Sequence, residues 1–274
     1  MTHDYSAWIG RRDEAEDVLD AARTRALQAA LGRESPVGPG DPLPPLHHWL
    51  YFWDVRPPAQ LGVDGHPARG GFLPPVSLPR RMWAGGRLEH LSPLRVGEPV
   101  RRVSTILGVE TKSGRSGALV FVTVRHELFG PGGLALREEQ DIVYRDPPAA
   151  GAPAPAGPPA PAEPDWEEEI LPDPVLLFRY SALTMNGHRI HYDRPYAMGE
   201  EGYPGLVVHG PLQASLLADL AGRRLGRPVA RFQFRGVSPA FDGAPLKVRA
   251  ARSDTGLTLW TEQGGRVAMT ATAE

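Results

Sequence analysis

The sequence contains no cysteine among its 274 residues. This absence excludes disulfides, cysteine nucleophiles and thiolate metal sites, and it is compatible with a reducing compartment. There is also no run of about 18 apolar residues, so no segment is expected to span a membrane. The first residues, MTHDYSAWIGRRDEAED, are polar and acidic rather than an apolar secretory signal. We therefore expect a soluble cytoplasmic protein.

An excess of charge of one sign is equally absent. The formal net charge is −2, and no block of like charges suggests a nucleic-acid-binding arm. Hydrophobic residues make up 41% of the chain, which is enough for real cores. The length suits two domains of about 100–150 residues each.

Proline and alanine are concentrated between residues 147 and 164, in the stretch PPAAGAPAPAGPPAPAEP. Such a segment cannot bury side chains and lacks many backbone donors, so it should run as an extended, semi-rigid spacer. We interpret it as a linker between an N-terminal domain, residues 1–146, and a C-terminal domain, residues 165–274. A long surface loop within one domain is the alternative.

The two halves show a similar order of elements. The first half predicts a helix over residues 14–31 and then four strand-like runs, at 87–91, 100–111, 118–128 and 135–144. β-branched residues dominate in 100–109 and 119–124. The second half predicts a helix over residues 210–225 and strands at 230–236, 246–253, 257–263 and 266–273. A helix followed by a four-stranded antiparallel meander in each half indicates an internal duplication.

The densest group of polar residues lies at 179–197, RYSALTMNGHRIHYDRPYA, and contains Asn186 and His191. A few residues later, His209 and Gly210 precede an apolar helix. Proline at position 211 suits a first helical turn, and a glycine N–H there could polarise a carbonyl oxygen. Taken singly, each histidine is more often structural than catalytic, and Gly-Pro is more often only a helix cap. Spacing alone names no reaction.

These residues resemble the MaoC-like hydratase/dehydratase family. Its motif, D-x-N-P-x-H, places an aspartate five residues before a catalytic histidine, and a glycine and the central helix of a hot-dog fold follow. NGHRIH supplies Asn186 and His191 at that spacing, and VVHGPLQASLLADL supplies the glycine and the helix. The family's aspartate is therefore an asparagine here, and an asparagine cannot act as a base.

Further segments extend the resemblance over essentially the whole chain, among them LPPLHHWLYFWD, RGGFLPPVSLPRRMWAGGRLEH, GRSGALVFVTVRHE and EEQDIVYR. They are similar to the two-domain mesaconyl-C4-CoA (3-methylfumaryl-CoA) hydratase group and to hydroxyacyl-thioester dehydratase type 2 proteins. The resemblance implies an α+β double hot-dog fold. Because the first half lacks the motif, we expect its copy to be degenerate, with a shortened central helix that leaves room for an acyl chain.

The resemblance implies a hydro-lyase acting on an α,β-unsaturated acyl-CoA, with His191 as the base, Gly210 as the oxyanion donor and Asn186 as a residue that orients water. His209 is expected to be structural. Neither a metal nor a cofactor is expected, apart from the CoA of the substrate, and HRIH lacks a third zinc ligand at suitable spacing. The residues expected to bind substrate are Arg189, Tyr192, Arg80, Arg81 and Trp83.

Two other functions stay open. One is a 3-hydroxyacyl-thioester dehydratase acting on ACP- or CoA-linked fatty acyl chains, which is the same chemistry in reverse. The other is a non-catalytic hot dog that only binds an acyl-thioester or a partner subunit. Two hot dogs in one chain can pair internally, so a pseudo-dimeric monomer or a homodimer of it is expected.

Overall fold

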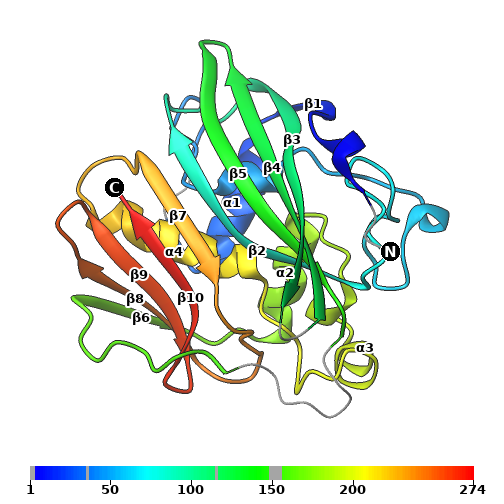
Figure 1. Cartoon of the computed structure of the whole chain (residues 1–274). Helices are drawn as coiled ribbons and strands as arrows, with labels where there is room; N and C mark the ends of the chain where they lie inside the picture. Colours follow the sequence, from blue (N-terminus) through cyan, green and yellow to red (C-terminus); the bar gives the residue numbers. More distant parts are fainter. Residues whose placement is uncertain (1–3, 35–36, 115–116, 148–155) are drawn as a thin grey trace.

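All strands of the computed structural model belong to one ten-stranded antiparallel sheet (Figure 1). The structure describes residues 4–34, 37–114, 117–147 and 156–274. Along the sheet, the strand order is β1-β3-β4-β5-β2-β7-β10-β9-β8-β6. The first half contributes β1 (Arg12–Val18), β2 (Arg80–His90), β3 (Pro99–Gly114), β4 (Gly117–Gly130) and β5 (Gly133–Arg145). The second half contributes β6 (Trp166–Ile170), β7 (Arg231–Gly236), β8 (Leu246–Arg252), β9 (Leu257–Gln263) and β10 (Arg266–Ala273).

One long helix lies against the strands of each half. In the second half this is α4 (Gly210–Arg224), which packs against β7, β8, β9 and β10 and buries nine of its residues. In the first half it is α1 (Ala21–Ala30), which is shorter and buries only Thr24 and Leu27. Figure 1 shows both helices behind the sheet. A sheet wrapped around a helix, present twice, is the arrangement expected of a double hot dog.

The two halves join where β2 pairs with β7. Gly85 and Gly86 lie at this junction, beside a bulge in β2. A Cβ at Gly85 would lie 2.6 Å from the carbonyl oxygen of Phe234, and a Cβ at Gly86 would lie 2.9 Å from the Phe234 ring. Glycine is therefore required for the two strands to come this close. One hydrophobic core continues through both halves and includes Leu27 and Leu50 from the first and Leu212 and Leu216 from the second.

The helix predicted over residues 14–31 is wrong in its first part. Residues Arg12–Val18 form β1, which pairs with β3 at the sheet edge, and the helix begins only after Asp20. The Asp20 carboxylate accepts the backbone N–H of Arg23 at 3.0 Å and so caps α1. Pairing with β3 therefore outweighs the helical spacing of Ala, Leu and Val before the cap. The first half therefore has five strands beside its helix, where four were predicted.

The second half contains three shorter helical segments before α4. These are α2 (Pro174–Leu183), the single 3-10 turn η4 (Arg189–His191) and α3 (Arg194–Gly199). Asp173 caps α2 by accepting the N–H of Leu176, and Asp193 caps α3 by accepting the N–H of Tyr196. Each helix thus has a capping aspartate and a proline in its first turn, Pro174 in α2 and Pro195 in α3, and the chain turns sharply around the polar motif.

Part of the predicted linker, residues 148–155, lies outside the described residues. Residues 156–164 run extended beside β10: Ala160 N–H donates to Gly265 O at 3.0 Å, and Val267 N–H donates to Pro158 O at 3.0 Å. Among the residues that the structure describes, no helix is long and apolar enough to cross a bilayer.

Candidate active site

His191 lies at the end of η4, and only 7% of its surface is exposed. Its Nδ1–H donates to the carbonyl oxygen of Val207 at 2.7 Å. Since a carbonyl only accepts, this bond fixes the tautomer and leaves Nε2 with a free lone pair. Burial lowers the pKa of His191 to about 4, although the bond to Val207 opposes that shift. The imidazole is therefore neutral at pH 7 and can accept a proton.

The imidazole of His209 is stacked on that of His191, with ring centroids 3.7 Å apart and an angle of 17° between the planes. His209 is fully buried, and its Nε2 shares a 2.8 Å hydrogen bond with Ser181 Oγ. Burial holds the pKa of His209 well below its usual range, and the neighbouring His191 lowers it further. His209 thus holds the His191 ring in place, as a structural residue would.

Asn186 lies in the turn between α2 and η4. Its backbone N–H donates to Ser181 O at 2.8 Å, and its side-chain carbonyl accepts the backbone N–H of His188 at 3.0 Å. Because the side-chain oxygen is engaged in this way, the amide NH₂ is the group left to contact a ligand. It can donate a hydrogen bond to a water oxygen but cannot take a proton from it.

Gly210 begins α4 and is followed by Pro211. The N–H groups of a first helical turn have no partner within the helix and lie at the positive end of its dipole. A Cβ built on Gly210 would meet only Met269 Cε, at 3.9 Å, so the space beside this residue is open. A carbonyl oxygen can therefore approach the Gly210 backbone closely.

His191, Asn186 and Gly210 line one cavity of about 530 Å³ between the halves. A second cavity of about 440 Å³ lies mainly in the first half. Both have in common the residues His66, Trp83, Gln140, Asn186 and Pro211. The second cavity also contacts a buried polar cluster in which the Glu138 carboxylate accepts hydrogen bonds from His48 at 2.8 Å and Trp49 at 3.0 Å. The three residues expected to carry the chemistry, His191, Asn186 and Gly210, are therefore brought together in the first of these cavities.

The residues expected to bind substrate divide into two groups. Arg80, Arg81 and Trp83 line the larger cavity. Arg80 is paired with Glu201 at 2.9 Å, and Trp83 donates its indole N–H to Gly85 O at 2.8 Å.

Arg189 and Tyr192 line neither cavity. The guanidinium of Arg189 pairs with Asp193 at 2.8 Å, and the hydroxyl of Tyr192 donates to Gly187 O at 3.0 Å. The sequence placed both beside His191, but their side chains bind the turn and, for Arg189, the carbonyl oxygen of Val63, rather than line a cavity.

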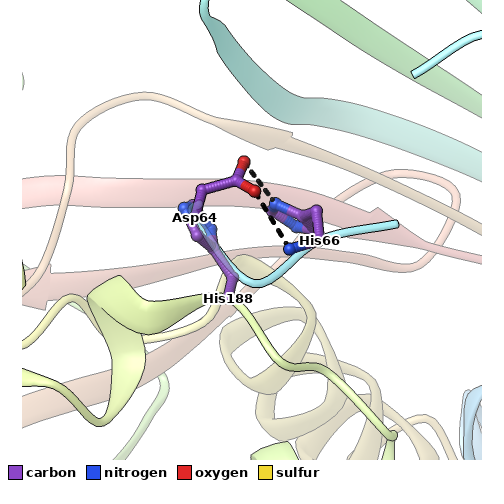
Figure 2. Close-up of side chains that lie close together, drawn as sticks. All are labelled: Asp64, His66 and His188. Carbon is purple, nitrogen blue, oxygen red and sulfur yellow. Dashed lines mark hydrogen bonds and ion pairs between the residues drawn. The ribbon is translucent and has the colours of Figure 1, made fainter. Parts of the chain in front are cut away.

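Two polar residues that the sequence analysis did not single out, Asp64 and His66, also reach this site. They lie in a loop of the first half, and Figure 2 shows them beside His188. The rings of His66 and His188 have centroids 4.1 Å apart, and His188 lies 5.5 Å from the His191 ring. The short string D-G-H reads as an ordinary surface turn, so no local signal distinguishes it.

Asp64, His66 and His188 each offer a metal-ligand atom, and these atoms lie within 4.8 Å of one another. However, His66 Nδ1 is already engaged, at 3.1 Å from the Asp64 carboxylate. The positive charges of Arg81 and Arg69 also lower the pKa of His66, and the same charges oppose a cation at this point. The geometry fits a carboxylate–imidazole pair better than a metal centre.

Comparison with known proteins agrees with this geometry. Residues 46–242 match the family model described as hydroxyacyl-thioester dehydratase type 2. The chain belongs to this family. It is 49% identical to the mesaconyl-C(4)-CoA hydratase of Chloroflexus aurantiacus, with 99% of this chain and 98% of the relative covered. It is 28% identical to the mitochondrial hydroxyacyl-thioester dehydratase type 2 of Schizosaccharomyces pombe, with 90% and 92% covered.

Among solved structures, a Mycobacterium tuberculosis protein described as having a double hot-dog fold is similar, with a TM-score of 0.59 at 15% identity. The similarity covers 97% of this chain and 95% of that one. The expected α+β double hot-dog fold is therefore confirmed.

Proposed function

We propose that this protein is a hydro-lyase that adds water reversibly across the double bond of an α,β-unsaturated acyl-CoA. The substrate we propose is a mesaconyl-type, C4–C5 dicarboxylic acyl-CoA. One observation carries the reaction type: His191 and Gly210 line the same cavity. His191 offers its free Nε2 there, and Gly210 offers the first N–H of α4. The 49% identity to a mesaconyl-C(4)-CoA hydratase over nearly all of both chains supports the substrate.

The thioester oxygen accepts a hydrogen bond from Gly210 N–H, and Asn186 holds the water through its amide NH₂. His191 Nε2 takes a proton from the water as the oxygen forms its bond to Cβ. The electron pair of the double bond moves to an enolate, which the Gly210 N–H and the α4 dipole stabilise. Protonation at Cα then completes the addition, and no redox change occurs.

A dicarboxylic substrate needs a cation for its second carboxylate, and we assign this role to Arg81. In a mesaconyl group joined to CoA through C4, that carboxylate is attached to Cβ, so its partner must lie beside the point of water addition. Arg81 lines the cavity of His191, and its charge lowers the pKa of both His66 and His188. Arg80 lines the same cavity, but Glu201 already neutralises it.

Within the described part of the chain, no carboxylate pairs with Arg81. Its guanidinium instead donates a hydrogen bond to the hydroxyl of Tyr144. Burial raises the pKa of Tyr144, and Arg81 opposes that shift. A neutral phenol leaves the guanidinium charge available, so a substrate carboxylate would be the first anion to meet it.

The alternative substrate is a longer 3-hydroxyacyl chain, as the names of the dehydratase relatives suggest. The second cavity of about 440 Å³ offers room for such a chain. Its walls, however, include the buried Glu138 and His48 and the half-buried Arg102, and Arg102 Nε has no hydrogen-bond partner among the described residues. An alkyl chain would leave these polar groups without solvent, so the lining favours a short or polar acyl group.

Hydration kinetics on mesaconyl-, fumaryl-, itaconyl- and crotonyl-CoA test the proposal. We expect the highest kcat/KM with a dicarboxylic C4–C5 substrate. Preference for crotonyl-CoA or longer chains supports the fatty-acyl dehydratase instead. If no enoyl-CoA is hydrated at high enzyme concentration, the chain is a non-catalytic acyl-thioester-binding protein.

A cytoplasmic location and a pseudo-dimeric monomer, or a homodimer of it, complete the proposal. The β2–β7 pairing joins both hot dogs inside one chain, which supports the pseudo-dimer. Light scattering on the purified protein separates one chain from two.

A further inference from the structure

A small loop of the first half is docked on the turn that carries the active-site motif. The loop closes on itself, because Gly62 N–H donates to His66 O at 2.7 Å. Across the contact, Arg189 N–H donates to Asp64 O at 2.9 Å, and the Arg189 guanidinium donates to Val63 O at 3.1 Å. Main-chain bonds therefore fix this loop, residues 61–67, against residues 186–189.

Two glycines make the contact possible. Gly65 has φ +87°, and a Cβ there would lie 2.0 Å from the carbonyl oxygen of Gly187. In the other direction, a Cβ at Gly187 would lie 2.8 Å from Gly65 O. Any larger residue at either position would push the loop away from the motif. The loop is thus built to place its own side chains beside His188 and Asn186.

Those side chains form an ordered carboxylate–imidazole pair. One Asp64 oxygen accepts the backbone N–H of His66 at 3.0 Å, and the other accepts its Nδ1–H at 3.1 Å (Figure 2). This arrangement fixes the tautomer of His66 and leaves Nε2 as a proton acceptor. His66 lines both cavities, as does Asn186.

Hydration requires two proton transfers, one from water and one to Cα, while Asn186 can perform neither. We propose that His66, oriented by Asp64, is a second catalytic residue of this site and transfers the proton at Cα. This assignment rests on the proposed hydro-lyase function.

In the hydration direction, water loses a proton to His191 Nε2 as its oxygen bonds to Cβ. The electron pair of the double bond then forms the new C–H bond at Cα with the proton from His66 Nε2. His191 is left protonated and His66 neutral, and one proton returns from His191 to His66 through solvent before the next turnover. Dehydration runs the same steps in reverse, with the Asp64 carboxylate stabilising the His66 imidazolium as it forms.

The charges around His66 come from several elements. Asp64 lies on its own loop and raises the pKa of His66, while burial, Arg81 of β2 and Arg69 lower it. His188 and His191 of the motif are its imidazole neighbours, and burial keeps both neutral, with pKa values of about 2 and about 4. Asp64 is therefore the group that favours a proton on His66 rather than on its neighbours.

The test compares His66→Gln with His90→Gln in the full chain. His90 is also largely buried with a lowered pKa, about 4, but it lines neither of these cavities. With the best substrate of the acyl-CoA panel, we expect kcat to fall by roughly 10²-fold for His66→Gln and to stay within a few-fold for His90→Gln. Circular dichroism and Tm confirm that each variant is folded.

A pH profile and an isotope effect separate proton transfer from a packing defect. Because hydration needs a neutral His191 and a protonated His66, kcat should have a bell-shaped pH profile. We expect His66→Gln to lose the alkaline limb, which His66 supplies. Hydration in D₂O labels Cα, and in dehydration of that product we expect the primary isotope effect on kcat to rise in His66→Gln. Asp64→Asn removes the charge and keeps only one of the two acceptor oxygens, so we expect that limb to shift to lower pH.

The outcomes distinguish this inference from the function on which it rests. An active wild-type enzyme whose His66→Gln variant keeps its kcat, pH profile and isotope effect overturns the role of His66 and leaves the hydro-lyase intact. A wild-type protein that hydrates no enoyl-CoA overturns both. Loss of wild-type activity on dialysis against EDTA, with recovery on adding Zn²⁺, would instead assign Asp64, His66 and His188 to a metal.

Discussion

His191 and Val207 are joined by a 2.7 Å hydrogen bond in which the imidazole Nδ1–H donates to the backbone carbonyl. This bond gives the buried ring one tautomer and one orientation, with Nε2 as the acceptor. The stacked ring of His209 limits the remaining freedom. The base is thus neutral and oriented, and no carboxylate among the described residues hydrogen-bonds to it.

Replacing His191 removes this base. We expect His191→Ala to lower kcat by about 10²–10⁴-fold, the usual contribution of a general base, while acyl-CoA binding measured by calorimetry changes little. His90→Ala is the control for loss of a buried histidine. Near-normal turnover by His191→Ala, with binding intact, would remove His191 from the mechanism.

The pH dependence of kcat/KM follows from the lowered pKa of His191. The base works only when neutral and is protonated below its pKa of about 4, so kcat/KM for hydration should be lost on the acid side only as that value is approached. Other buried histidines also have lowered pKa values, so the unfolded chain binds more protons in acid and stability declines there. Circular dichroism at each pH separates unfolding from titration. If kcat/KM for hydration is instead lost on the acid side near the ordinary histidine value of about 6.5, with the fold intact, the assignment is contradicted.

Gly210 gives a test that leaves the fold in place. Gly210 is helical rather than left-handed, and a Cβ would make only ordinary contact with Met269 at 3.9 Å, so Gly210→Ala should keep its Tm. The added methyl group occupies the space through which the thioester oxygen approaches the N–H. We expect kcat/KM to fall by about 10²-fold, as for loss of one oxyanion donor. An unchanged kcat/KM would place the thioester oxygen elsewhere.

From α4 to the last strand, the fold could be predicted closely from the sequence, whereas β6, α2 and α3 of the second half were not predicted. The predicted helix at 210–225 and the strands at 257–263 and 266–273 agree with α4, β9 and β10 to within a residue. The apolar pattern of α4 is strong because nine of its fifteen residues are buried, and the helix packs against β7, β8, β9 and β10. In the first half, β1 lies at a sheet edge with mostly exposed residues, so its apolar signal is weak and pairing with β3 decides its conformation.

The motif of the candidate site could be predicted because its residues are close in sequence, and the resemblance also pointed to Arg80, Arg81 and Trp83, which line the same cavity. Asn186, His191 and Gly210 follow one another along one segment, and the resemblance gave their spacing. Asp64 and His66 arrive through a loop-on-loop contact that depends on Gly65 meeting Gly187. No periodicity or spacing encodes such a contact, because it forms only once both halves are folded together.

Arg81 gives the last test, which concerns substrate selection. Removing its charge while keeping an apolar stem should affect dicarboxylic substrates far more than neutral ones, because only the former offer a carboxylate to the guanidinium. We expect Arg81→Met to lower kcat/KM for mesaconyl-CoA by at least about tenfold, while kcat/KM for crotonyl-CoA changes little, so that the ratio between them falls.

Arg137→Met is the matched control for Arg81→Met. Arg137 lies on β5, pairs with Glu89 at 2.9 Å and lines neither active-site cavity. It should leave the mesaconyl-to-crotonyl ratio unchanged. An equal loss on both substrates in Arg81→Met would assign this arginine to the CoA portion that they share, and the partner of the second carboxylate would then have to be sought at Arg145 or Arg102, which also line these cavities.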